Sequence, residues 1–181
     1  LKLAQSNLAQ VMISPLLHLF SKSIFTASRK GRLFALFRHP VHRAISMKHY
    51  LSTASWDPLY NPSLSTMTML EYAKSGSIEH NWVTRFLVDK QGGKLTRDDM
   101  KAAKEILRTK CLVGLFDELE SSLARFELYF GWSTKTRTES QACRTAVLQA
   151  GDPRHTVQEV SAENEEYKAI VAANVFDMEL Y

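Results

Sequence analysis

The sequence contains only two cysteines, Cys111 and Cys143, too few for a disulfide framework. Cys111 lies in an apolar run and is expected to be a buried thiol, although one bridge between the two cysteines also fits the sequence. No run of 18 apolar residues occurs, so we expect no membrane-spanning helix within these residues. Histidine and cysteine do not recur at the spacing of metal ligands, so we expect no metal site.

Two binding motifs are also missing. The loop G-x-x-x-x-G-K-[ST] does not occur, which argues against a P-loop kinase. No motif combines aromatic and basic residues for nucleic acid, so the net charge of +4 favours an anionic cofactor or a polyanionic substrate. With 45% hydrophobic and 23% charged residues, the chain is typical of one globular domain. It begins with Leu1 rather than Met, and we expect a piece of a longer protein.

A predicted strand and helix organise the chain. The apolar run Leu33–Phe37 follows a basic turn at residues 29–32 and is typical of a buried strand in a parallel sheet. Pro40 suits the first turn of a helix, which we expect over residues 41–54. Its expected apolar side, which we expect to hold the helix to the sheet, consists of Ala44, Ile45, Met47, Tyr50 and Leu51.

Arg38 stands at the carboxyl end of this strand, beside the predicted helix N-terminus. Open α/β sheets bind ligands at that position, and free N–H groups and the helix dipole favour an anion there. A guanidinium can hold a phosphate through two hydrogen bonds, and Ser46, about two turns into the helix, can add a third. The pattern therefore predicts an anion site, although an arginine paired with a carboxylate and a solvent-facing serine fit it equally well.

Further elements complete an α/β prediction with a mostly parallel central sheet flanked by helices. A second strand is expected over 111–116, followed by a helix over 118–130. Capping signals start two more helices, Thr68 with Glu71 and Thr96 with acidic residues in the first turn. We expect residues 133–160 to be irregular and residues 163–181 to be helical.

Four blocks, in order, resemble sulfotransferases, especially the Golgi carbohydrate sulfotransferases. Residues 38–46 are similar to the family's R-x-P-x-x-R-x-x-S element, and residues 81–87 to N-x-x-x-R-x-L. The unit beginning at Val113 resembles V-G-L-x-E-x-x-x-x-S-x-x-x-F, and residues 174–181 resemble N-x-x-D-x-x-L-Y. The resemblance covers residues 31–181.

The resemblance implies a P-loop-NTPase-like sulfotransferase fold, with residues 1–181 as a catalytic domain incomplete at its N-terminus. It implies transfer of a sulfuryl group from 3′-phosphoadenosine 5′-phosphosulfate (PAPS), without a metal, to a hydroxyl of an acceptor such as a carbohydrate. In the family, the first arginine and the serine of the motif hold the donor's 3′-phosphate, which points to Arg38 and Ser46. Arg43 matches the middle arginine, expected to support the turn. The resemblance also implies the Golgi lumen, with membrane attachment through an upstream segment.

Three further residues are candidates, each with a structural alternative. His18 occupies a place comparable to an upstream histidine of some family members and is a candidate catalytic base, or a partly buried histidine on a helix flank. Arg85 is a candidate for substrate or donor contact, or a surface salt bridge. Trp56, in a loop over residues 55–66, suits a sugar-binding lid, or pins the loop to the core.

The sequence departs from the family in one respect. The loop that holds the donor's 5′-phosphosulfate, a turn with glycine and lysine or arginine, does not occur before Arg29. We therefore expect the chain to carry half of the donor site and to be inactive by itself. An alternative is a sulfotransferase-like module that binds nucleotide or anionic glycan without turnover.

Overall fold

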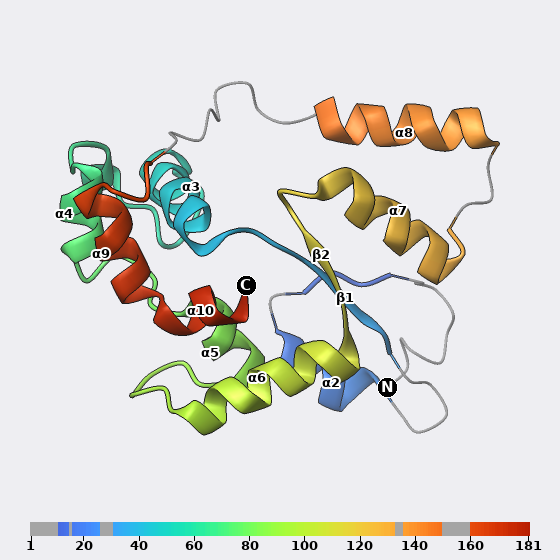
Figure 1. The fold of residues 1–181 in the computed structure, drawn as a ribbon, viewed down its shortest axis with the longest axis horizontal. Coiled ribbons are helices and arrows are strands. Elements are labelled where there is room, and N and C mark those ends of the chain that lie inside the picture. The colour runs from blue at the N-terminus through green and yellow to red at the C-terminus, as the bar shows by residue number, and fades with distance from the viewer. Residues whose placement is uncertain (1–10, 15, 26–30, 133–135, 150–159) are drawn as a thin grey trace.

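The computed structural model describes residues 11–14, 16–25, 31–132, 136–149 and 160–181. In these residues, helices surround one pair of parallel strands (Figure 1). The helices are α2 (Leu17–Ile24), α3 (Pro40–Thr53), the 3₁₀ helix η1 (Pro62–Ser65), α4 (Met69–Lys74), α5 (Trp82–Val88), α6 (Arg97–Lys110), α7 (Leu119–Phe130), α8 (Arg137–Gln149), α9 (Glu165–Ala173) and α10 (Val175–Leu180). The expected α/β class is thus present in a helix-rich form with a small parallel sheet.

Both predicted strands are confirmed, and they pair with each other. β1 (Leu33–Phe37) and β2 (Cys111–Leu115) run parallel and in register along their whole length. Beyond the last pair, the Phe116 N–H donates to the Phe37 carbonyl at 2.7 Å. The two carboxyl ends therefore lie at one edge of the sheet, and the residues that follow each strand are neighbours there.

Helix α7 covers one face of the strand pair at very short range. A Cβ at Gly114 would lie 2.7 Å from the Phe126 ring and 2.9 Å from Cβ of Ser122, so only glycine fits between strand and helix. The Ser122 hydroxyl accepts a hydrogen bond from the Leu115 N–H (2.9 Å) and donates one to its carbonyl (3.1 Å). Phe34 of β1 packs edge-on against Phe126, with ring centroids 5.3 Å apart. The V-G-L…S…F pattern is thus a strand–helix packing motif.

An apolar cluster lies beside α3 and includes no residue of either strand. It joins α3 to η1, α4 and α9 and includes Val41, Ile45, Leu64, Tyr72 and Ile170. We expected the apolar side of α3 to hold it to the sheet, and this expectation is wrong. The expected side itself is correct for Ala44, Ile45 and Leu51, whereas Tyr50 is 37% exposed. Periodicity identifies a buried side but not the element that buries it.

Two other helix predictions need correction. Residues 137–149 form α8, although we expected an irregular segment over residues 133–160. The predicted helix over residues 163–181 is two helices, α9 and α10, that meet at Asn174. Residues 29 and 30 of the basic turn lie outside the described residues.

The helix starts predicted from capping signals are confirmed. Thr68 and Glu71 form a complete capping box at α4, and Thr96 and Asp99 form one at α6. In each box the hydroxyl accepts from the backbone of the third residue, and that residue's carboxylate accepts from the backbone of the cap. None of the helices in the described residues is long and apolar enough to cross a membrane.

Candidate functional site

Polar side chains gather at the carboxyl edge of the strand pair. Arg38 and His39 follow β1 directly, and Asp117 and Glu118 follow β2 after Phe116. The parallel register places these two short segments side by side. This is the edge at which open α/β sheets bind their ligands.

The N-terminus of α3 opens at the same edge. His39 is its N-cap, and its Nδ1 atom accepts a hydrogen bond from the Val41 N–H at 3.3 Å. Burial lowers the pKa of His39, the electrostatic interaction with His42 lowers it further, and Asp117 acts in the opposite direction. His39 therefore favours the neutral form that its role as acceptor requires.

Arg38 is the principal cation of the edge. Its guanidinium carbon lies 5.0 Å from the centre of the Phe116 ring. Burial lowers the pKa of Arg38, and the charge of Asp117 partly offsets this effect. Its Nε atom is buried and has no hydrogen-bond partner in the protein. Because an unpaired buried donor costs about 1–3 kcal/mol, a hydrogen-bond acceptor that reaches this atom would be favoured.

Asp117 is held by the last residue of the sequence. The Tyr181 hydroxyl donates to Asp117 Oδ2 at 2.9 Å, and burial together with this bond raises the pKa of Tyr181 to about 12. His42 Nδ1 lies 3.9 Å from Asp117 Oδ1, and both side chains are about 40% exposed. An ion pair of that length and exposure contributes little energy, so Tyr181 is the main partner of Asp117.

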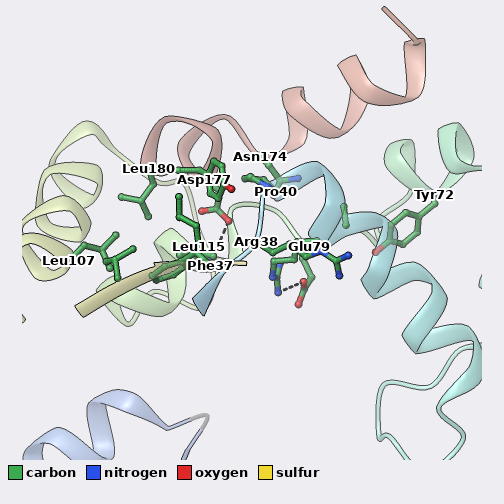
Figure 2. Close-up of a pocket in the computed structure, with 15 residues that line it drawn as sticks. Phe37, Arg38, Pro40, Tyr72, Glu79, Leu107, Leu115, Asn174, Asp177 and Leu180 are labelled. Atoms are coloured by element: carbon green, nitrogen blue, oxygen red, sulfur yellow. Dashed lines mark hydrogen bonds and ion pairs between the residues drawn. The ribbon is translucent and has the colours of Figure 1, made fainter. Parts of the chain in front are cut away.

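A cavity extends from this edge into the molecule, between α3, α5 and α10 (Figure 2). Toward one end its lining is apolar and includes Leu107, Leu115 and Leu180. Arg38 and Glu79 lie in its middle part, and Tyr72 reaches it from α4 on the other side. The cavity thus combines an apolar part with a polar part, and the polar part includes Arg38, the residue predicted to bind phosphate.

Arg43 fastens α3 to the segment before α5. Its guanidinium pairs with Glu79 at 2.5 Å and lies 4.4 Å from the centre of the Trp82 ring. Trp82 in turn stacks on Phe86, with centroids 4.9 Å apart. With both an ion pair and a cation–π contact inside the protein, Arg43 has a supporting position, and Arg38 is the better placed of the two for a ligand.

The N-termini of α5 and α10 cap each other. Asp177, only 3% exposed, accepts from the Val83 N–H (2.9 Å), the Thr84 N–H (2.8 Å) and the Thr84 hydroxyl (2.7 Å). Asn81, which adopts a left-handed conformation (φ 53°), accepts from the N–H groups of Phe176 and Asp177. The motifs N-x-x-x-R-x-L and N-x-x-D-x-x-L-Y thus form one reciprocal clasp, which holds one wall of the cavity.

The structure separates several of the candidate residues from Arg38. Ser46 lies six residues after Pro40 on α3, about 9 Å along the axis, so an anion that touches both would lie along the side of the first two turns. The Nε2–H group of His18 donates a hydrogen bond to the Phe86 carbonyl at 3.0 Å. It lines a different cavity together with Leu33 and Lys110, where the two strands begin. His18 therefore lies at the edge opposite Arg38 and is not brought to it.

Arg85 and Trp56 also lie apart from Arg38. The Arg85 guanidinium donates to three backbone carbonyls, those of His80 (3.0 Å), Lys90 (3.3 Å) and Gly93 (2.9 Å). These bonds fasten the two loops that flank α5, and whether Arg85 also contacts a ligand stays a prediction. Trp56 is 79% exposed and follows the C-terminus of α3, whose length of roughly 20 Å separates it from Arg38.

Sequence patterns did not identify Tyr72, Glu79, Asp117 and Tyr181 as members of this site. Asp117 carried a usable signal, because it follows a predicted strand just as Arg38 does. Glu79 and Tyr72 stand in a loop and on a short helix with no distinguishing spacing. Only the packing of α4 against α9 and α3 brings Tyr72 to the cavity.

Among the described residues, no group of three or more His, Cys, Asp or Glu side chains is arranged to hold a metal ion. No protein-family model, no curated protein and no solved structure matched the chain.

Proposed function

We propose that this chain belongs to a PAPS-dependent sulfotransferase and that Arg38 contacts the donor's 3′-phosphate. The observation that carries the proposal is the position of Arg38, at the carboxyl edge of two parallel strands and beside the N-terminus of a 14-residue helix. Its buried Nε atom has no partner in the protein. A phosphate oxygen at this edge would accept hydrogen bonds from the terminal N–H groups of the Arg38 guanidinium and would benefit from the helix dipole. The motif resemblance around residues 38–46 selects PAPS among phosphate-bearing ligands.

The proposed reaction is in-line transfer of a sulfuryl group to an acceptor hydroxyl, for which we propose a carbohydrate. The acceptor oxygen forms the new S–O bond, and the bond from sulfur to the 5′-phosphate oxygen breaks. A base takes the hydroxyl proton, and adenosine 3′,5′-bisphosphate leaves. In this proposal Arg38 and Ser46 position the donor, which is a large part of catalysis for group transfer. No described residue is assigned as the base, since His18 lies at the opposite edge of the sheet.

The test is calorimetric titration with adenosine 3′,5′-bisphosphate and with adenosine 5′-monophosphate. Loss of a hydrogen bond to a charged group costs about 1.5–3 kcal/mol. Arg38→Ala should therefore weaken the binding of the bisphosphate by roughly 10- to 150-fold. Ser46→Ala should lose less, because one neutral donor is removed. Binding of the 5′-monophosphate should change little in either variant. Arg108→Ala is the matched control, since this exposed arginine pairs only with Glu105 on the same helix in the described part of the chain.

Two outcomes would change the proposal. Equal losses for both nucleotides would mean that Arg38 supports the fold and does not contact the 3′-phosphate. Selective binding of the bisphosphate without sulfuryl transfer, in the chain joined to any upstream segment, would favour the alternative of a nucleotide- or glycan-binding module. A mass-spectrometric assay for sulfated acceptor separates the enzyme from that module.

A further inference from the structure

Three buried polar atoms without a hydrogen-bond partner belong to residues that line the single cavity behind the carboxyl edge. They are Nε of Arg38, the hydroxyl oxygen of Tyr72 and Oε2 of Glu79. Tyr72 is fully buried, and Glu79 Oε2 has its ion pair with Arg43 but accepts no hydrogen bond. Most buried polar atoms in proteins are hydrogen-bonded, so three exceptions around one cavity indicate a shared partner.

The charges around the cavity disfavour an ion as the partner inside it. The ionised side chains in its lining are two arginines, Arg38 and Arg43, and two carboxylates, Glu79 and Asp177, so their formal charges cancel. Asp177 is fully used by the N-terminus of α5. A further cation would meet the arginines, and an anion would meet Glu79. The partner is therefore neutral.

The size and the hydrogen-bonding groups of the cavity narrow the choice to water. The cavity offers about 50 Å³ to the centres of water molecules, and one water needs roughly 10–15 Å³ on this measure. A guanidinium N–H and a phenol O–H donate into the cavity, and a carboxylate oxygen accepts from it. Because a water molecule both donates and accepts, it satisfies this set, whereas an apolar occupant would leave Arg38 Nε and the Tyr72 hydroxyl unpaired.

We propose that ordered water in this cavity bridges Tyr72, Glu79 and Arg38, and that Tyr72 thereby acts as a positioning residue for the Arg38 guanidinium. Burial raises the pKa of Tyr72 to about 12, so its hydroxyl stays protonated and able to donate at neutral pH. The Tyr72 hydroxyl and Arg38 Nε donate to the water, and the water donates to Glu79 Oε2. With Nε bonded toward the interior, the remaining guanidinium N–H groups are oriented for a ligand at the sheet edge.

A crystal structure of the chain at high resolution tests the water site directly. We expect ordered water within hydrogen-bond distance of Tyr72 and of at least one of Arg38 and Glu79. A crystal structure of the Tyr72→Phe variant should lack the density for the water beside the ring of residue 72. The surrounding side chains should keep their positions. A dry cavity, or a direct hydrogen bond between Tyr72 and Glu79, would overturn the proposal.

The positioning role rests on the proposed function and has its own readout. Tyr72→Phe should weaken the binding of adenosine 3′,5′-bisphosphate about 3- to 10-fold, which is the range for one lost neutral hydrogen bond. The affinity for adenosine 5′-monophosphate should change less than about 2-fold. Tyr129→Phe is the matched control, because Tyr129 is 52% exposed on α7, away from the cavity lining. Circular dichroism and a denaturant midpoint establish that each variant folds.

The crystal structure and the nucleotide titration together distinguish a failure of the water-bridge proposal from a failure of the proposed function. If the wild-type chain does not bind the bisphosphate, the proposed function fails, and the crystal structure still decides whether the water site exists. If water is present but Tyr72→Phe leaves bisphosphate affinity unchanged, Tyr72 is not a positioning residue. If both nucleotides weaken equally, the hydroxyl supports the fold in general and the positioning role is refuted.

Discussion

Asp177 is the position at which one substitution should do most harm to the fold without touching the apolar cluster. Its carboxylate accepts three hydrogen bonds, two from backbone N–H groups of α5 and one from the Thr84 hydroxyl. Asp177→Ala would leave these donors buried at the start of α5 and would open one half of the clasp with α10. Because Asn81 caps α10 in return, the loss should loosen both helices.

The magnitude follows from those three bonds. Hydrogen bonds to a charged group contribute about 1.5–3 kcal/mol each, and the cost of burying the carboxylate offsets part of their sum, so Asp177→Ala should lower the free energy of unfolding by roughly 3–5 kcal/mol. Asp177→Asn should lose about half as much, because one oxygen still serves Thr84 while the new NH₂ group faces the Val83 N–H. In a domain of this size, 4 kcal/mol corresponds to a fall in Tm of roughly 8–16 °C.

Chemical denaturation, with midpoint and slope both fitted, is the assay. The matched control is Glu179→Ala, two residues further along the chain, whose exposed carboxylate pairs with Arg97 and Lys104. Exposed ion pairs contribute little, so this variant should lose less than about 1 kcal/mol. If Asp177→Ala and Glu179→Ala were equally mild, the reciprocal clasp would not be an important source of stability, and the reasoning from buried capping bonds would be refuted.

Three other predictions concern packing, acid stability and thiol chemistry. Ile45→Ala should lower the free energy of unfolding by about 2–4 kcal/mol, because Ile45 is only 7% exposed. Tyr50→Ala, at an exposed site of the same helix, should lower it by less than about 1 kcal/mol. Equal denaturant midpoints for the two variants would mean that the buried side of α3 is wrongly assigned. The pKa of Asp99 is lowered from 3.8 to about 2, by the hydrogen bond of a nearby lysine and then by the α6 cap, so its stabilisation is complete above pH 4 and disappears as the pH falls toward 2. Asp99→Asn should therefore flatten the acid side of a midpoint-against-pH curve, and an unchanged slope would contradict this. Burial raises the pKa of Cys111 to about 11 while Cys143 is exposed, so at pH 8 alkylation followed by mass spectrometry should label Cys143 at least about 10-fold faster; equal rates would show that Cys111 is accessible.

Several features could be predicted because they depend on neighbours in the chain. The runs at residues 33–37 and 111–115 are apolar and short and are bounded by charged residues, which favours strands whatever surrounds them. The two capping boxes use side chains three residues apart, so their partners are local as well. The position of Arg38 at a strand end followed from the same local pattern.

The predictions that failed depended on which distant elements meet. Periodicity showed that Ile45 is buried, but α4, α9 and η1 cover it rather than the sheet. The segment of α8 is mostly polar and lacks a strong apolar stripe, so its sequence predicted an irregular segment instead of a helix. The candidate residues His18 and Trp56 looked compatible with Arg38 along the chain, yet a strand and a long helix separate them from it.

The sequence by itself determined the two strands, the capped helix starts and the cation at a strand end, since propensity, capping and short apolar runs act within a few residues. Only the tertiary structure decided that the strands pair in parallel, that Asn81 and Asp177 cap each other's helices, and that Tyr72 and Glu79 line the cavity behind Arg38. The physical reason is that burial and hydrogen-bond partners across more than 90 residues are set by how helices pack, and no local pattern records that packing.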